Sequence, residues 1–562
     1  MAEPHFSLGL DFGTSSIRAL VVSVDDGREV GLAAGPFEHG SDGVIGDSRD
    51  PNIARQHPGD YKTGAEKAIR GALAQAARES EFRPDRIVGI GVDATASTPI
   101  PVDAELQPLA NRPEFVDDLN ALAWLWKDHT AYAEAEAITE IAARDHPEYL
   151  ARIGGTYSSE WLFAKLLHCL RIAPHVISQA ADWIEQGDYI VGFLTGVKSV
   201  RELKRNVCAA GHKAMYSQEW GWPPLAFFNE VDPQLGQWCE GRLSDQVFAA
   251  GKRAGGLCPE WAERTGLPAG IPVSMAGIDA HVGAVGAGIR TGTLVKILGT
   301  SGCDMAVHPS DRTLPDIPGL CGIVQGSILP GYYGLEAGQP ALGDLFGWFV
   351  RRFTRPAGLT HEDLTRDAAK LQPGESGLLA LDWNNGNRCV LADPRLTGLL
   401  VGQTLQTSPS EVYRALLEAA AFGARTIMQR FEDHAVSVDQ VVVCGGIAEK
   451  NQLLLQIYAD VTDRPIFVSG SQETCALGAA ILGSVAAGQA AGGHDSVETA
   501  HDAMSSLKEH HFTPNAGACE VYDELYQLYL ELYKAFGEKE QGPPLYGVMK
   551  TLITIREKVR QQ

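Results

Sequence analysis

Residues 8–21 read LGLDFGTSSIRALV, and this stretch decides the fold. The apolar segment 8–10 is typical of the end of a buried strand, and a second apolar run begins at Ala19. Because small residues at 13–16 separate the two runs, the stretch predicts a β-hairpin with a tight polar turn.

The turn of this hairpin is suited to binding a phosphate group. It offers backbone N–H groups and hydroxyls with little bulk in the way. Asp11 stands beside it, where a carboxylate is placed to hold Mg²⁺ directly or through water. An ordinary hairpin with a polar tip has the same pattern, so this stretch alone leaves both interpretations open.

A second stretch repeats the pattern. Residues 292–298, GTLVKIL, predict a strand, and the small turn 299–302 leads into the strand-like segment 305–307. The turn residues Gly13 and Gly299 are 286 positions apart, close to half the chain length. The repeat predicts an internal duplication that gives two related α/β lobes, with their phosphate turns facing one cleft.

Composition excludes some classes of function. The chain has 562 residues, for which two large domains are a fair expectation, and 44% hydrophobic and 21% charged residues are ordinary for a globular protein. A net charge of −23 argues against a nucleic-acid partner, which needs an excess of Lys and Arg. A small anion in a local pocket stays compatible with this charge.

The chain shows no sign of a membrane or secretory role. The N-terminus has no basic region followed by an apolar one. The long uncharged segment 475–493, CALGAAILGSVAAGQAAGG, is rich in Gly and Ala and predicts a buried helix rather than a membrane span. Ten scattered cysteines without a CxxC motif favour a cytoplasmic chain with reduced thiols, and no His/Cys cluster has metal-ligand spacing.

Two further segments bear on nucleotide binding. The strand 86–92, RIVGIGV, carries part of a dinucleotide fingerprint, but its glycines lie inside the strand and Pro99 follows where a helix should open, so we reject that interpretation. The apolar segment 441–443 leads into a Gly-Gly turn and a helix up to Val461. Such a turn lets a flat ligand approach the backbone.

Two long helices complete the pattern. Apolar periodicity predicts a helix over 408–432 with Ser410 as its N-cap. A final helix over 521–536 places four tyrosines on one face, which predicts packing on the body of the protein; a homodimer interface is the alternative.

Four segments in order resemble the FGGY family of carbohydrate kinases: DFGTSSIR, AGIDAHVGAVGAG, ILGTSG and VVVCGGIAEKNQLLLQIYAD. The resemblance runs from Gly9 to about Gly483, with His168 in place of a usual Trp as a departure. It implies an α/β fold of two actin-like (ribonuclease-H-like) lobes with a central catalytic cleft. Residues 1–288 would form the sugar-binding lobe, and 289–562 the nucleotide-binding lobe with a C-terminal helical tail.

Within the family, four segments are similar to the branch that phosphorylates L-ribulose with ATP at its 5-hydroxyl, in L-arabinose breakdown. They are DATAST (93–98), WKDHTA (126–131), GHKAM (211–215) and GLEAGQ (334–339). Two alternatives stay open: a kinase of the same family for xylulose, D-ribulose or ribitol, and an actin-like ATPase or pseudokinase.

The resemblance also implies roles for single residues. Asp279 would be the catalytic base, although a helix cap is the plain interpretation of an acid there. Asp11 would hold Mg²⁺. The sugar would be bound by Ala96, Trp126, Lys213, Asp279 and Glu336, and ATP by Gly13, Thr14, Ser15, Arg18, Gly299, Thr300, Ser301, Gly445, Gly446 and Asn451. Without the resemblance, Lys213 would be taken for a surface lysine and Trp126 for a core residue, and Arg18 also suits pairing with a carboxylate.

Overall fold

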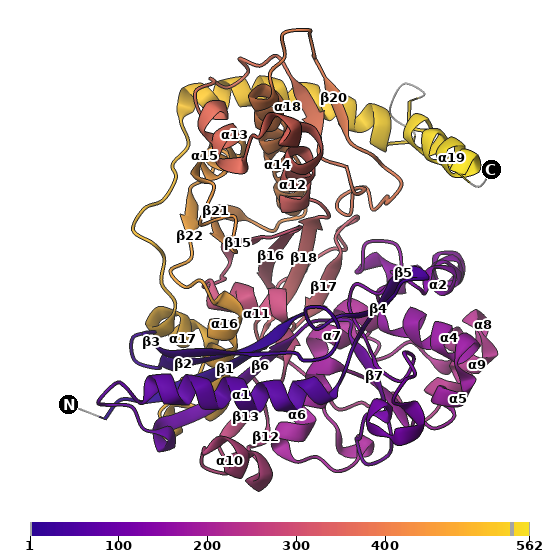
Figure 1. The fold of residues 1–562 in the computed structure, drawn as a ribbon, viewed down its shortest axis with the longest axis vertical. Coiled ribbons are helices and arrows are strands. Elements are labelled where there is room, and N and C mark those ends of the chain that lie inside the picture. Colours follow the sequence, from indigo (N-terminus) through magenta and orange to yellow (C-terminus); the bar gives the residue numbers. More distant parts are fainter. Residues whose placement is uncertain (1–2, 540–544, 561–562) are drawn as a thin grey trace.

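The computed structural model describes residues 3–539 and 545–560. They form two lobes, each built on a mixed β-sheet, with helices packed on the sheets (Figure 1). The first sheet has seven strands, and its main path runs β12 (Arg253–Gly256), β13 (Pro272–Ser274), β6 (Ile87–Ala94), β1 (Phe6–Phe12), β2 (Ser16–Ser23) and β3 (Glu29–Pro36), with β14 (Gly277–Ile278) also paired to β6.

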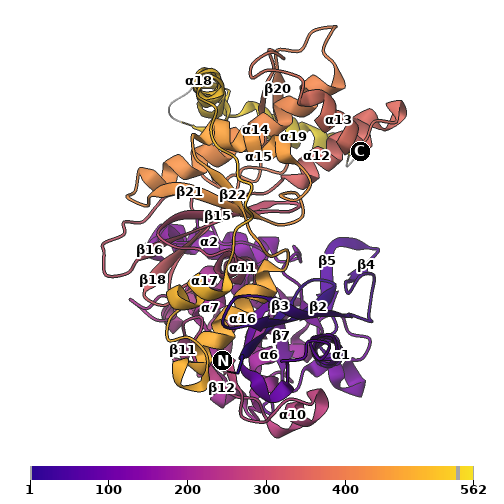
Figure 2. The same ribbon diagram turned by 90° about the vertical axis from the view of Figure 1, so that its left-hand side faces the viewer.

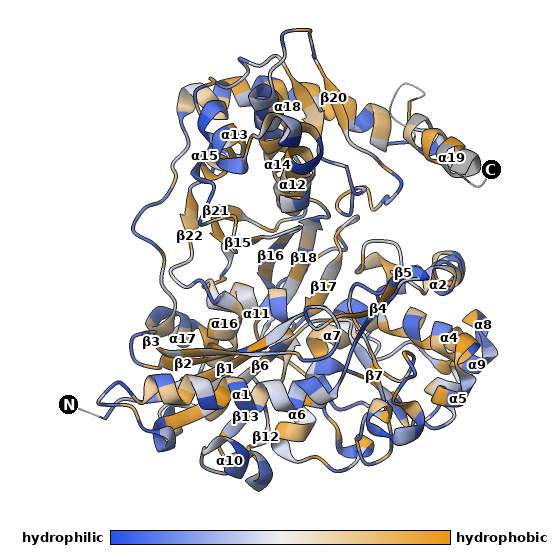
Figure 3. Ribbon diagram, viewed as in Figure 1, coloured by the Kyte–Doolittle hydropathy of each residue, from blue (hydrophilic) through white to orange (hydrophobic). Residues whose placement is uncertain are grey.

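The second sheet has six strands. Their order is β17 (Gly322–Gln325), β18 (Tyr332–Gln339), β16 (Gly302–Pro309), β15 (Gly292–Leu298), β21 (Val438–Cys444) and β22 (Ile466–Val468). Strands β21 and β22 are largely hydrophobic, as expected for strands covered on both faces (Figure 3).

The two sheets share a central arrangement. Strand β1 pairs antiparallel with β2 and parallel with β6, and β15 pairs antiparallel with β16 and parallel with β21. Both predicted hairpins are therefore confirmed. The rejection of a dinucleotide fold is confirmed as well, because β6 is followed by another strand, β7 (Pro99–Val102), instead of a helix.

A helix from late in the chain covers the first sheet. Helix α16 (Thr474–Ala487) packs on β1 and β6 and against α11 (Asp279–Gly286), between the two sheets (Figure 2). A Cβ atom at Gly91 would lie 1.6 Å from the Ala479 carbonyl oxygen, so only glycine permits this approach. The predicted small-residue helix is thus confirmed, and within the part of the chain that the structure covers no helix has the length and apolarity to span a bilayer.

The helix predictions need one correction. Helix α14 (Pro409–Glu432) is capped by Ser408, whose hydroxyl accepts from the backbone N–H of Glu411 while the Glu411 carboxylate accepts from the Ser408 N–H. Ser410 lies inside the first turn, so its assignment as N-cap is wrong. Proline fits at the first helical position, which places the cap one residue before Pro409.

The tyrosine face of the last long helix packs inward. Helix α18 (Ala516–Gly537) buries Tyr522, Tyr526, Tyr529 and Tyr533, and the Tyr529 ring lies 5.4 Å from that of Phe422 on α14. Packing on the body is therefore confirmed. A homodimer stays a prediction, as does a division of the chain after residue 288.

A helical region extends the first lobe on one side (Figure 1). It contains α2 (Tyr132–Asp145), α4 (Leu162–Ile172) and α7 (Val207–Ala214), which surround an aromatic core that includes Trp124, Phe163 and Phe228. Residues 182–195 form β9 (Asp182–Glu185) followed directly by α6 (Gln186–Thr195). Helix α7 lies next to β17 and so brings its side chains to the second lobe.

Candidate active site

Three carboxylates gather where strands of the first sheet end. Asp11 on β1 stands directly opposite Asp93 on the parallel strand β6. Gly277 on β14 pairs with Asp93, and two residues later Asp279 begins α11. Asp11 and Asp93 are buried and Asp279 is half-buried. The sheet register therefore brings together acids from three distant parts of the sequence.

Burial raises the pKa of all three carboxylates, and the charge of Asp11 adds to the shift at Asp93 and Asp279. Burial, and then the charge of Asp11, raises the pKa of Asp279 to about 6. Burial and the charges of Asp11 and Asp279 raise the pKa of Asp93 well above its usual value. The pKa of Asp11 is also raised by burial, but the Arg18 guanidinium 3.3 Å away opposes the shift. Asp279 thus stays able to accept a proton at neutral pH.

Asp93 was not among the predicted site residues. Neither of its carboxylate oxygens has a hydrogen-bond partner among residues 3–539 and 545–560, although the side chain is fully buried. A buried carboxylate without a partner is costly, and a divalent cation shared with Asp11 would remove that cost. Oxygen donors of this kind fit Mg²⁺. The signal was present in the sequence, since Asp93 ends a buried apolar strand as Asp11 does.

A second polar group lies on the side of the second lobe. Glu336 on β18 accepts from Lys213 Nζ on α7 at 3.2 Å and from Arg388 at 3.0 Å. Burial alone would raise the pKa of Glu336, but Lys213 and Arg388 outweigh it and hold the pKa well below its usual range. Lys213 is buried rather than a surface lysine.

The two groups belong to one site. Helix α11 connects them, because it begins with Asp279 and places His281 Nε2 3.6 Å from Glu336 Oε2. The charges of Lys213 and Glu336 also act on the pKa of Asp279. Arg388 was missed by sequence reasoning. It lies in an irregular segment between β19 (Leu379–Leu381) and β20 (Leu399–Val401), and we find no local pattern that would have revealed it.

Trp126 connects the sugar side to the first phosphate turn. Its Nε1–H donates to the Thr14 hydroxyl at 3.0 Å, and the side chain is 38% exposed. The expectation of a core residue, made without the family resemblance, is therefore wrong. Ala96, which was also predicted to contact the sugar, is half-buried at the turn after β6. We call the segments around Ala96 and Trp126 the sugar wall.

A buried lysine connects the two segments of the sugar wall. Lys165 Nζ on α4 donates to the carbonyl oxygens of Ser97 and Leu125, each at 2.8 Å, and to that of Trp124 at 3.3 Å. It thereby fixes the backbone next to both predicted sugar residues, Ala96 and Trp126. Burial lowers the pKa of Lys165 to about 7. We assign it a positioning role that the sequence prediction did not include.

The two predicted phosphate turns differ in their surroundings. In the first turn, Gly13 N–H donates to the Ser16 carbonyl at 3.1 Å. In the second turn, the Thr300 carbonyl accepts from the N–H groups of Leu342 and Asp344, at the start of helix α12 (Gly343–Phe349). Arg18 pairs with Asp11 and, at 3.1 Å, with Glu473, so the structure gives it two carboxylate partners.

The predicted adenosine segment follows β21. Gly445 has a positive φ of 92°, which glycine adopts without strain, and a Cβ at Gly446 would meet no atom within 4 Å. Asn451 caps α15 (Gln452–Thr462) by accepting from the Leu454 N–H at 3.0 Å. The open space beside Gly446 fits a flat ligand, and the contact itself stays a prediction.

One expectation about metal ligands is wrong. The tertiary structure places Cys208, His212 and His281 so that one ligand atom of each lies within 4.8 Å of the others. Cys208 and His212 are four residues apart on one helix, and this spacing was a usable signal.

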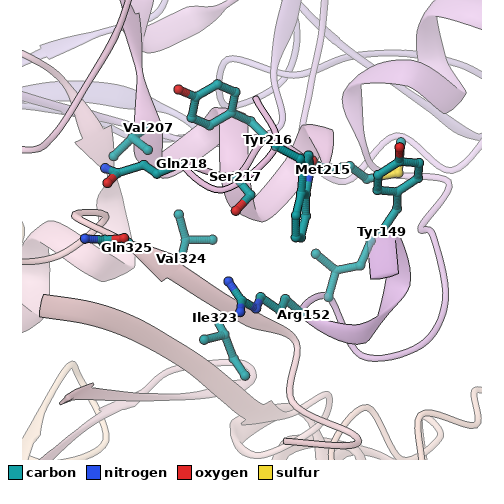
Figure 4. A pocket seen from close by; sticks show the side chains of 13 residues that line it. Tyr149, Arg152, Val207, Met215, Tyr216, Ser217, Gln218, Ile323, Val324 and Gln325 are labelled. Atoms are coloured by element: carbon teal, nitrogen blue, oxygen red, sulfur yellow. The ribbon is translucent and has the colours of Figure 1, made fainter. Parts of the chain in front are cut away.

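A pocket between α7 and β17 contains none of the predicted site residues. Figure 4 shows Arg152 extending toward Ile323 and Val324 of β17, with Tyr149 and Met215 on the other side. Arg152 also pairs with Glu219 at 2.9 Å and Asp316 at 3.0 Å. The pocket therefore marks a junction between the lobes, separate from the carboxylate group.

Comparison with known proteins bears on this arrangement. Residues 6–286 match the model described as the FGGY family of carbohydrate kinases, N-terminal domain, and residues 294–487 match the C-terminal domain of the same family. A ribulokinase from Shouchella clausii is 40% identical over 574 residues, covering 99% of both chains. A ribulokinase from Mycolicibacterium smegmatis is 40% identical over 571 residues, 99% of this chain and 98% of that one.

Solved structures agree in fold. A xylulose kinase from Rhodospirillum rubrum superimposes with a TM-score of 0.75 at 25% identity, covering 95% of this chain and 99% of that one. A glycerol kinase with ADP from Plasmodium falciparum gives 0.74 at 16% identity, covering 94% and 98%. The two actin-like lobes predicted from the sequence are therefore confirmed.

Proposed function

The chain belongs to the FGGY family of carbohydrate kinases, and on this premise we propose that it transfers the terminal phosphoryl group of ATP to the 5-hydroxyl of L-ribulose, giving L-ribulose 5-phosphate in L-arabinose breakdown. Full-length relatives at about 40% identity that carry the name ribulokinase support the choice of sugar. The observation that carries the reaction is the place of Asp279 at the start of α11, beside the strand ends that hold Asp11 and Asp93 and on the helix whose His281 contacts Glu336.

Asp279 is the general base. Its carboxylate takes the proton of the 5-hydroxyl as the bond between oxygen and phosphorus forms. One of its oxygens accepts from the Ala280 N–H at 2.7 Å, which fixes the side chain at the start of α11. The raised pKa of about 6 makes the carboxylate a better proton acceptor than a solvent-exposed aspartate, while leaving it ionised at neutral pH.

The sugar is held from three sides. Lys213 donates to a sugar oxygen and Glu336 accepts from a hydroxyl, and the backbone at Ala96 adds a further contact. The exposed face of Trp126 packs against the carbon chain. Because both lobes supply residues, their closure around sugar and nucleotide would exclude water and limit wasteful hydrolysis of ATP.

The nucleotide lies between the two turns. Backbone N–H groups and hydroxyls of Thr14, Ser15, Thr300 and Ser301 donate to the phosphates. Gly13 and Gly299, whose own N–H groups close the two turns, leave room for the phosphates, and Gly445, Gly446 and Asn451 border the adenosine. Asp11 and Asp93 would hold Mg²⁺, and Arg18 orients Asp11. Mg²⁺, when bound there, neutralises charge on the transferred phosphoryl group.

A sugar panel tests this proposal. ADP release is measured by a coupled assay with L-ribulose, D-ribulose, xylulose and ribitol, and the product is identified by phosphorus NMR. We expect the highest kcat/KM for L-ribulose and a 5-phosphate product. Preference for another sugar would assign the chain to a different kinase of the family, sugar-independent ADP release would indicate an ATPase, and absence of turnover a pseudokinase.

A matched variant pair locates the sugar. Arg388→Met removes one partner of Glu336, while Arg312→Met changes an exposed arginine that makes no ion pair with any residue in the described ranges. We expect Arg388→Met to raise the KM for L-ribulose about tenfold, as for loss of a charged hydrogen bond, and Arg312→Met to leave it unchanged. Equal KM values in both variants would contradict the placement of the sugar at Glu336.

A further inference from the structure

Beside the ion pairs of Glu336 lies a group of side chains that the proposed phosphoryl transfer does not use. Cys208 and His212 project from α7, and His281 projects from α11. All three are at most 1% exposed. The two imidazole rings lie 4.3 Å apart, and one ligand atom of each of the three residues lies within 4.8 Å of the others.

The imidazole nitrogens of this group are short of partners. His212 Nδ1 and both ring nitrogens of His281 make no hydrogen bond to any part of the chain that the structure describes. Buried polar atoms without partners are costly and uncommon, so each calls for an explanation. The other nitrogen of His212, Nε2, contacts the Ser327 hydroxyl at 3.1 Å, an outer contact of the kind that orients metal-binding histidines.

Glu336 can supply a fourth ligand atom. Glu336 Oε2 lies 3.5 Å from His212 Nδ1 and 3.6 Å from His281 Nε2. Sulfur, two imidazole nitrogens and a carboxylate make a four-ligand set that suits Zn²⁺, whereas Mg²⁺ and Ca²⁺ prefer oxygen alone. Ligands of one Zn²⁺ ion lie roughly 3.3–3.7 Å apart, so binding would draw the side chains together by about 1 Å.

We propose that Cys208, His212, His281 and Glu336 form a binding site for Zn²⁺ or a similar thiophilic divalent cation. On binding, the Cys208 thiol gives its proton to solvent and the sulfur forms the metal bond, with no change of oxidation state. No other group of the described residues combines a thiol with two imidazoles at such distances.

The site has a consequence for the sugar. Coordination would take the Glu336 oxygen that now accepts from Lys213 and would add positive charge beside Lys213 and Arg388, so the ion pair that is proposed to bind the sugar and the cation site exclude each other. The cation is therefore an inhibitor that competes with the sugar, a conclusion that rests on the proposed function. Binding of the cation rests only on the four side chains.

A second group, His39, His57 and Asp60, serves as an internal control. It is more open, since His39 is exposed and His57 half-buried. Asp60 already accepts from His39 Nδ1 at 2.7 Å and from two backbone N–H groups. It contains no sulfur, so cobalt bound there produces no thiolate absorption.

Cobalt titration tests the site directly. The full-length protein is stripped with chelator and titrated with Co²⁺, whose bond to a thiolate gives a charge-transfer band in the near ultraviolet. We expect one such Co²⁺ per chain, displaced by Zn²⁺, with the band absent in Cys208→Ser and weakened in His281→Gln. Cys258→Ser, at a half-buried cysteine on another face of the first lobe, and His57→Gln should keep it. Absence of the band in the wild type, or its persistence in Cys208→Ser, would overturn the site.

Kinetics test the competition. At buffered free Zn²⁺ ten times its Kd, mutually exclusive binding raises the apparent KM for the sugar about 11-fold and leaves kcat unchanged. In Cys208→Ser the same Zn²⁺ should leave KM unchanged, and thermal melting confirms that the variant is folded. Equal inhibition of Cys208→Ser would overturn the competition. If the cobalt band forms but no sugar is phosphorylated, the metal site stands and the proposed function fails.

Discussion

The two hairpin turns of this protein have similar backbones and different chemistry. Each hairpin carries an ion pair between directly opposite residues, Asp11 with Arg18 in the first and Lys296 with Asp304 in the second. In the first pair the arginine side chain is 47% exposed, whereas in the second both side chains are at most 1% exposed. The open pair is accessible to a ligand, and the closed pair is part of the core.

The residues at the ends of the neighbouring strands also differ in polarity between the two sheets. In the first sheet, Asp11 stands opposite Asp93, and in the second sheet the corresponding strands place Ile297 opposite Cys444. In the first sheet the strand ends therefore carry carboxylates, and in the second sheet they carry apolar side chains. The two hairpins therefore share a backbone that a phosphate can approach. The side chains at the strand ends differ, and only the first lobe supplies carboxylates for a metal ion.

The largest effect is expected at the closed pair. Asp304→Asn leaves the Lys296 ammonium buried without its counter-charge and should lower the free energy of unfolding by about 3–5 kcal/mol. Chemical denaturation of the full chain measures it. Arg18→Met at the open pair is the matched control and should cost about 1 kcal/mol or less. Equal losses in the two variants would remove the distinction between the pairs.

The next effect concerns the carboxylates of the first lobe. Asp279→Asn removes the base and should lower kcat by about two orders of magnitude or more, with the sugar Kd and the melting temperature little changed. Single-turnover kinetics and calorimetric sugar titration separate the two quantities. Near-wild-type turnover would exclude Asp279 as the base.

The same residue predicts a pH dependence. Asp279 accepts a proton only when ionised, and its pKa is raised to about 6 by burial and by Asp11. The value of kcat/KM should therefore be constant above that pH and fall about tenfold per pH unit below it. The residual activity of Asp279→Asn should show no such fall. A wild-type profile that stays flat down to pH 5 would argue against this pKa.

The smallest effect is expected from the hydrogen bond between Trp126 of the sugar wall and Thr14 of the first turn. Trp126→Phe keeps an aromatic face but loses the hydrogen bond to Thr14, and should raise the KM for the sugar roughly 2- to 10-fold. Trp348→Phe is the control, since Trp348 is also 38% exposed and lies on α12 (Gly343–Phe349). A rise of the same size in both variants would show that the hydrogen bond has no part in it.

Parts of the site were accessible to sequence reasoning because they depend on neighbours in the chain. Gly445 follows a short buried strand and needs its positive φ, and Asn451 begins a helix as a cap; both are local signals. The cap of α14 shows the limit of such signals, because Ser408 and Ser410 flank the same proline and a shift of two residues separated the prediction from the structure.

The sequence by itself determined the two hairpins, the buried helix α16, the family and the residues around which the site is built, since short-range patterns encode strands, turns and helices. Only the tertiary structure decided which charges meet: Arg388 reaches Glu336, Asp93 is left without a partner, and His281 joins Cys208 and His212. The physical reason is that burial and pairing set the cost of a charge, and both depend on contacts between residues far apart in the chain.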